Sequence, residues 1–179
     1  MSDTEISQPQ AGSDQASPTP YKVVYAGFWW RALAGSIDIL VLNLGAWIGQ
    51  MAILGAIYWA RVLMGEKTLL ATDISDSFHW AVVEGLNAAI YIALSIPYYV
   101  TAHFKYGTTL GKRPFRIYVV NAADGMPITK KQSWIRWMGY LASYLPLGAG
   151  YLMAAFHPEK KALHDIIART ISVRKKKAE

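Results

Sequence analysis

The sequence contains no cysteine, so it can form neither a disulfide bond nor a thiolate metal site, and it does not reveal the redox compartment. Internal repeats of fixed period are also absent, which argues against a duplicated transporter within one chain. No short apolar segment with a small-residue cleavage site precedes the first long apolar run, so we expect no removable signal peptide. No nucleophile, base and orienting group form a recognisable pattern, and we predict no enzyme, cofactor or metal site.

Formal charge is missing from three long stretches. Between Asp38 and Arg61 lie 22 uncharged residues, a second uncharged run covers 85–102, and a third fills the 20 positions 137–156. About 20 apolar residues form a helix that crosses a hydrocarbon core about 30 Å thick. With 53% apolar and 13% aromatic residues, the sequence predicts an all-α integral membrane protein with two or three transmembrane helices. The predicted segments are a first span at about 33–60, an external loop at 61–80, a second span at about 81–102, a basic loop at 103–136 and a third apolar segment at 137–156.

The third apolar segment has two interpretations. Its centre reads "SYLPLGAGY", where Pro146 lacks a backbone donor while Gly148 and Gly150 permit a sharp turn. We favour two half-helices folded back on themselves, and the alternative is a full third span with a proline kink.

The distribution of basic residues bears on this choice. Residues 61–84 hold two basic and four acidic side chains, whereas 103–136 hold seven basic residues and one aspartate, and the segment from 157 onward holds seven basic residues and three acids. Basic residues stay in the cytoplasm, so we expect the loop 103–136 and the C-terminal segment on the cytoplasmic face of a bacterial inner membrane. A full third span would separate them, which favours the hairpin.

Short polar or alternating segments flank the membrane domain, which we place at 25–173. Residues 1–24 are rich in Ser, Pro, Gln and Asp and are predicted to be a disordered tail, and 174–179 form a basic tail. The segments "RPFRIYVV" and "RTISVRK" have strand character, and the first precedes the turn signal Asp124-Gly125, so we predict a short cytoplasmic β-hairpin or strand pair. "TKKQ" at 129–132 predicts a capping box that opens a basic amphipathic helix at the headgroup surface.

Three fragments, in order, resemble the RDD family of small membrane proteins, named for one arginine and two aspartates. They are "RALAGSID", "YGTTLGKRPFRIYVVNAADGMPIT" and "KKALHDIIARTISV". The positions that match the family's pattern are Arg31, Asp38, Gly107, Thr109, Leu110, Gly111, Lys112, Asp124, Gly125, His164, Asp165 and Thr170. Pro114 and Arg169 depart from it, since an apolar residue and a glycine are more usual there.

The resemblance implies a multi-pass bacterial membrane protein, with two classes of function among similar proteins. Some resemble sodium or lithium ion/proton antiporters, and related domains are accessory or scaffolding subunits of membrane complexes. Arg31 and Asp38 are about 10 Å apart along a helix, and Asp165 could lie between them. We favour a structural Arg-Asp-Asp cluster that attaches the tail to the first helix. The alternatives are an ion-coupling site, in which an aspartate exchanges a proton for a cation, and a site for a soluble ligand or lipid headgroup.

Other candidate sites are weaker. "GTTLGK" lacks the spacing of a phosphate loop. Asp73, Asp76, His79 and Glu84 could bind a divalent cation, but we favour Asp76 as a helix cap and the others as solvated. Gly45 and Gly49 permit close helix approach within the chain or in a homo-oligomer or membrane complex. The basic loop and "RKKK" at 174–177 suit anionic lipids rather than nucleic acid.

Overall fold

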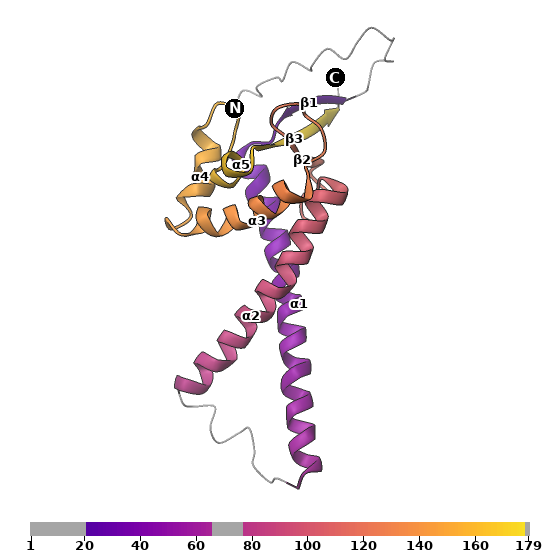
Figure 1. The fold of residues 1–179 in the computed structure, drawn as a ribbon, viewed down its shortest axis with the longest axis vertical. Helices are drawn as coiled ribbons and strands as arrows, with labels where there is room; N and C mark the ends of the chain where they lie inside the picture. Colours follow the sequence, from indigo (N-terminus) through magenta and orange to yellow (C-terminus); the bar gives the residue numbers. More distant parts are fainter. Residues whose placement is uncertain (1–20, 66–76, 178–179) are drawn as a thin grey trace. The chain divides into compact units, whose positions relative to one another are not determined.

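The computed structural model describes residues 21–65 and 77–177. The elements in chain order are β1 (Tyr21–Tyr25), α1 (Phe28–Leu63), α2 (Ser77–Thr101), a π-helical segment (Ala102–Tyr106), β2 (Ile117–Asn121), α3 (Lys130–Tyr144), α4 (Ala149–Phe156), α5 (Leu163–Ala168) and β3 (Thr170–Lys177) (Figure 1). They divide into two compact units. The helix-pair unit comprises residues 39–97, and the mixed unit comprises the described residues before 39 and after 97.

Within the described ranges, two helices are long and apolar enough to cross a membrane, over Phe28–Leu63 and Trp80–Tyr106. Within the helix-pair unit, α1 and α2 run antiparallel. Gln50 Nε2 donates to the carbonyl oxygen of Val83 at 2.7 Å, and Asn87 Nδ2 donates to Gln50 Oε1 at 3.0 Å. Hydrogen bonds of this kind, made by amide side chains between two helices whose other side chains are apolar and exposed, are typical of helices surrounded by lipid.

The glycine pair in α1 lies against α2 of the same chain. A Cβ atom at Gly45 would lie 3.5 Å from Leu94, and one at Gly49 would lie 3.4 Å from Ile90. Of the two interpretations of this pair, the structure therefore shows the contact within the chain. Self-association through this pair stays a prediction.

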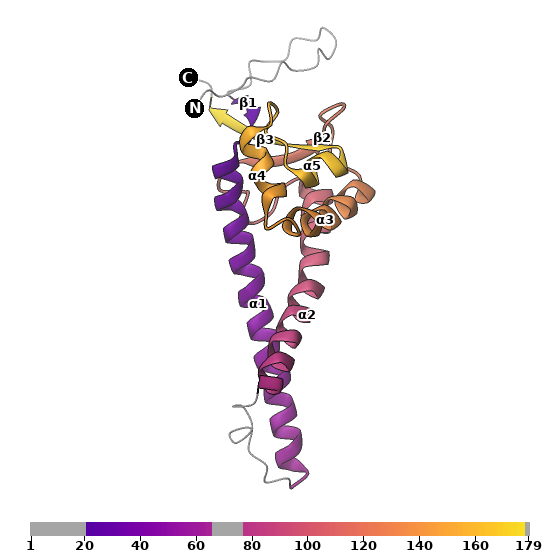
Figure 2. The ribbon, with the colours of Figure 1, turned by 90° about the vertical axis from the view of Figure 1, so that its left-hand side faces the viewer.

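The mixed unit contains a three-stranded antiparallel sheet of order β1-β3-β2 (Figure 2). The predicted pairing of the loop strand with the C-terminal strand is confirmed, with Val119 opposite Ser172. Two boundaries need correction. Residues 21–24, which we assigned to the disordered tail, belong to β1, and most of the basic tail belongs to β3, which reaches Lys177. The reason is that β1, of sequence "YKVVY", pairs with the second edge of β3.

The third apolar segment does not form one continuous helix. The predicted capping box is confirmed at the start of α3, where Gln132 N donates to Thr129 Oγ1 and Thr129 N donates to Gln132 Oε1. Helix α3 ends at Tyr144 and α4 begins at Ala149, with Leu147 and Gly148 at φ values of 51° and 81° between them. The segment therefore forms two helices, as the hairpin interpretation predicts, and no single helix covers 137–156, because the turn around Pro146 interrupts it.

Glycines bring the short helices of the mixed unit into close contact. A Cβ atom at Gly139 of α3 would lie 2.9 Å from the Cα atom of His164 in α5. One at Gly150 of α4 would lie 2.5 Å from the Cα atom of Ser143 in α3. Since real Cβ atoms do not approach so closely, this packing requires glycine at both positions. It places the start of α5 directly against α3.

Candidate functional site

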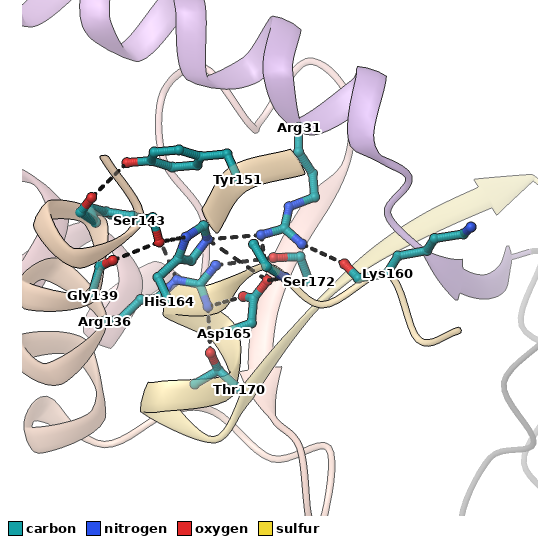
Figure 3. A network of polar contacts seen from close by, with 12 residues as sticks. Arg31, Arg136, Gly139, Ser143, Tyr151, Lys160, His164, Asp165, Thr170 and Ser172 are labelled. Carbon is teal, nitrogen blue, oxygen red and sulfur yellow. Dashed lines mark hydrogen bonds and ion pairs between the residues drawn. The ribbon is translucent and has the colours of Figure 1, made fainter. Parts of the chain in front are cut away.

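Asp165, in the first turn of α5, lies between two arginines from different helices (Figure 3). Arg31 Nη2, from the start of α1, donates to Asp165 Oδ2 at 2.5 Å, and Arg136 Nη1, from α3, donates to Asp165 Oδ1. The backbone N–H of Ala162 also donates to Oδ2, at 2.9 Å. Asp165 is fully buried, and both of its oxygens have donors. The carboxylate therefore joins α1, α3 and α5.

Arg136 is also fully buried, and its guanidinium reaches four side chains. Besides Asp165, its hydrogen bonds go to Tyr140 through Nε, to Thr170 through Nη1 and to Ser172 through Nη2. Burial, the largest single effect, lowers the pKa of Arg136, but Asp165 and Tyr140 together raise it above its usual value. Likewise, burial raises the pKa of Asp165, while Arg136 and Arg31 hold it well below its usual range. This ion pair therefore stays charged at neutral pH.

The hydrogen bonds of His164 indicate which of its ring nitrogens carries the proton. Arg31 Nη2 lies 2.9 Å from His164 Nε2, and arginine can only donate, so Nε2 is the acceptor. His164 Nδ1 lies 3.3 Å from Ser143 Oγ, which itself donates to the carbonyl oxygen of Gly139 at 2.7 Å. Nδ1 is therefore the donor. Burial lowers the pKa of His164 well below its usual value, which keeps the imidazole neutral. Its role here is to orient Arg31 toward Asp165.

Asp38 has a separate set of partners. Tyr98 donates its hydroxyl to Asp38 Oδ1 at 2.5 Å, Thr109 Oγ1 donates to Oδ2 at 2.5 Å, and the backbone N–H of Gly111 donates to Oδ1 at 2.8 Å. All three donors are neutral. A Cβ atom at Gly111 would lie 2.1 Å from the carbonyl oxygen of Ala34, so only glycine lets this loop approach α1.

The predicted cluster of Arg31, Asp38 and Asp165 therefore needs correction. Arg31 and Asp165 form an ion pair as expected, but Asp38 lies in the second set of contacts with Thr109 and Gly111. The physical reason is distance: two helical turns separate Arg31 from Asp38, so the carboxylate of Asp165 cannot lie next to both. A different segment, the loop after α2, supplies the partners of Asp38.

Lys112 and His103 form a third buried contact. Lys112 Nζ lies 3.0 Å from His103 Nε2, and both residues are buried. Burial, followed by the positive charges of Arg136 and Arg31, lowers the pKa of Lys112 to about 7. His103 belongs to the π-helical segment, which ends at Gly107 with a φ of 63°. Among the described residues, His103 Nδ1 is the one buried side-chain nitrogen or oxygen atom without a hydrogen-bond partner.

Two signature residues lie apart from these contacts. Asp124 and Gly125 form the turn after β2, where Asp124 Oδ1 accepts from the N–H of Met126 at 2.9 Å and Gly125 has a φ of 69°. Of the proposed acidic cation site, Asp73 and Asp76 lie outside the described residues. Within the described ranges, no group of three or more His, Asp or Glu side chains is placed to hold a metal ion.

Sequence reasoning missed two of the most important residues. Arg136 was counted as a positive charge of the loop, although its position within "SWIRWMGY" makes it a lone charge among aromatic and apolar residues. That pattern is a usable signal for a buried arginine, since such a charge needs a partner. Tyr98 had no comparable signal. Its hydroxyl binds Asp38, which lies 60 positions away in the sequence.

Among the described residues, the structure has two candidate membrane-spanning helices and a small mixed unit built around buried charges. Its pattern matches that of a known family, and the chain belongs to the RDD family, whose profile covers residues 25–169. It is also 32% identical over 152 residues to the uncharacterized protein YxaI of Bacillus subtilis (strain 168), which covers 81% of this chain and 94% of that protein. No solved structure matches the chain.

Proposed function

We propose that this protein is an accessory or scaffolding component of the bacterial inner membrane, in which the Arg31–Asp165–Arg136 network holds the cytoplasmic unit together. The observation that carries the proposal is that network itself. It joins α1, α3 and α5, and through Thr170 and Ser172 it also holds β3. A buried carboxylate between two arginines, with both oxygens accepting hydrogen bonds from within the chain, is suited to locking chain segments in place.

The ion-coupling alternative is less well supported by the geometry. A coupling carboxylate must have oxygens that can exchange a proton for a cation. Both oxygens of Asp165 and both oxygens of Asp38 already accept hydrogen bonds from within the chain. A cation would have to displace two arginines in one case, or a tyrosine, a threonine and a backbone amide in the other. We therefore do not propose an antiporter.

The sheet supports the proposed topology. Its strands come from the segment before α1, the loop after α2 and the C-terminal segment, so all three must lie on one side of any membrane that α1 and α2 cross. Two crossings satisfy this requirement. The many basic residues of the loop and C-terminal segment favour the cytoplasmic side and contact with anionic lipids. We further propose that this unit, rather than the spans, receives any partner protein of a membrane complex.

One experiment distinguishes a structural role of the charged network from cation transport. The purified protein is reconstituted into vesicles with a trapped pH dye, and gradients of sodium, lithium or potassium are applied. We expect no proton movement above that of empty vesicles, and we expect Asp165→Asn to lower the amount of folded protein. Cation-driven proton movement that disappears in an Asp165→Asn or Asp38→Asn variant of normal abundance would overturn the proposal. Tags after Asp124 and after Glu179 should both be accessible only from the cytoplasm.

A further inference from the structure

Helix α3 is amphipathic in the opposite sense to a helix on the surface of a soluble protein. Its buried side chains include Ser133, Arg136 and Ser143, together with Gly139. Its exposed apolar side chains include, at helical spacing, Trp134, Met138 and Leu141, followed by Leu145 just after its end. In water, a helix normally buries its apolar face and exposes its polar face. A helix that exposes its apolar face and buries its polar face is expected where the medium around it is more apolar than the part of the protein that it packs against.

The turn between α3 and α4 is the most exposed apolar part of this region. Tyr144, Leu145 and Leu147 are 74%, 81% and 101% exposed. Leu147 also has a φ of 51°, a conformation in which a leucine is strained and a glycine is not. A strained leucine whose side chain is fully exposed gains no stability from that side chain in water. Its presence makes physical sense if the side chain is inserted into another apolar medium.

Helix α4 continues this apolar surface. Gly150 and Ala154 are buried, whereas Leu152, Met153 and Phe156 are exposed. From 137 to 156 the chain has no charged residue, and at the other end α3 begins with exposed Lys130 and Lys131. The apolar turn is thus at one end of this surface, and the two lysines and Trp134 are at the other. This order matches a membrane leaflet, in which acyl chains lie beneath anionic headgroups.

We propose that α3 and α4 form a hairpin that inserts into one leaflet of the bilayer without crossing it. This inference rests on the proposed membrane location and goes beyond it, because it assigns the face formed by Trp134, Met138, Leu141, Leu145 and Leu147 to lipid rather than to protein. Arg136 and its network then lie just behind the inserted face, on the same helix. Lipid contact on one side of α3 thus fixes the position of Arg136, which binds Asp165 on the opposite side of the helix.

The absence of cysteine provides a direct test, because each introduced cysteine is the single labelling site. Leu147→Cys and Met138→Cys report on the hairpin, Leu44→Cys reports on the first span, and Ala123→Cys is a control on an exposed turn. Each variant carries an environment-sensitive fluorophore in nanodiscs of zwitterionic and anionic lipids. The quenchers are lipids with a nitroxide near the headgroup or near the chain end, and aqueous iodide.

We expect the shallow lipid quencher to act several-fold more strongly at Leu147 and Met138 than at Ala123, with iodide showing the opposite order. The deep quencher should act most strongly at Leu44. Hairpin labels that iodide quenches as strongly as the Ala123 label would overturn the proposal. Labels shielded from both lipid and iodide would also overturn it, since a second copy or another protein would then cover the face. A Leu44 label that lipid quenchers do not reach would show that α1 does not cross the membrane. The insertion of the hairpin is decided by the labels at Leu147 and Met138 alone.

A matched pair of variants tests the strained leucine. In the Met138→Cys background, Leu147→Gly removes the tip side chain and relieves the backbone, whereas Met126→Gly removes an exposed side chain outside the hairpin. We expect the first change to reduce shallow quenching at position 138 and the second to leave it unchanged. Equal quenching in both variants would show that Leu147 does not anchor the hairpin.

Discussion

The mixed unit contains two buried aspartates that are held in different ways. Asp165 has two arginine partners, Arg31 and Arg136, whereas Asp38 has the hydroxyls of Tyr98 and Thr109 and one backbone amide. Both aspartates are 1% exposed or less. Neutralising Asp165 leaves two arginines without their counter-ion. Neutralising Asp38 leaves only neutral hydrogen-bond donors behind. Equal burial therefore does not imply equal energetic consequence.

The comparison also accounts for the buried lysine nearby. Arg31 and Arg136 carry two positive charges, and Asp38 and Asp165 carry two negative charges, so these four groups balance. A proton on Lys112 adds an unbalanced charge to a buried region, and its Nζ contacts an imidazole rather than a carboxylate. The low pKa of Lys112 follows from burial and from the two arginines.

The largest effect is expected for Asp165→Asn. This change leaves Arg136 fully buried without its counter-ion, so the free energy of unfolding should fall by about 3–5 kcal/mol. Chemical unfolding in nanodiscs, followed by tryptophan fluorescence, measures it. Asp124→Asn, on an exposed turn, should change the stability by less than about 0.5 kcal/mol. A loss at Asp165 no larger than at Asp124 would refute a structural ion pair.

The next effect concerns how the loop reaches Asp38. In Gly111→Ala the new Cβ atom collides with the carbonyl oxygen of Ala34, a backbone atom, so the loop must withdraw and Asp38 loses its amide donor. We expect a loss of about 2–3 kcal/mol. The control is Gly35→Ala in α1, next to Ala34, where a Cβ atom meets nothing within 4 Å. That change should stabilise the helix by about 0.5–1 kcal/mol, and equal effects of the two would contradict the proposed contact.

Asp38→Asn is the direct counterpart of the first prediction. The amide keeps the shape, but its oxygen accepts weaker hydrogen bonds and its NH2 group, itself a donor, replaces one accepting oxygen, so we expect a loss of about 2 kcal/mol. The same unfolding measurement applies, with Tyr98→Phe as a companion that removes one donor from the set. If Asp38→Asn costs as much as Asp165→Asn, the distinction between charged and neutral partners is wrong.

The last expected effect is a change of stability with pH, and it comes from Lys112. Its pKa is about 7 in the folded protein and 10.5 in the unfolded chain, so between these values the unfolded chain binds more protons. The contribution of this group to stability therefore rises with pH from about 7 to 10.5 and is constant below 7. Lys112→Met should remove that slope. Unfolding midpoints of both proteins across this pH range test it, and parallel curves would contradict it.

Several features could be predicted because they depend on neighbouring residues. Long uncharged runs indicate the two candidate spans, and the capping box of Thr129 and Gln132 is a local pattern that the structure confirms. The break at Pro146 and Gly148 follows from backbone chemistry. Residues 21–24 of strand β1 are predicted as tail because a short strand next to a polar segment gives little signal, and the strand forms through pairing with β3.

The candidate site was only partly predictable. The family resemblance identified Arg31, Asp38 and Asp165, but these residue types do not reveal which charge pairs with which. Arg136 became the second partner of Asp165 because Gly139 and Gly150 bring α3, α4 and α5 close together. Its burial depends on packing of helices that the sequence placed at the membrane surface.

By itself, the sequence determined the two apolar helices, the interruption of the third segment and the presence of charges beside apolar runs, because composition and local backbone preference decide these features. Only the tertiary structure decided how the charges are shared. Arg31 and Asp165 are 134 positions apart, and Asp38 and Gly111 are 73 positions apart. Such pairings depend on the geometry with which distant segments meet, since a buried charge takes whichever donors the fold brings within hydrogen-bond distance.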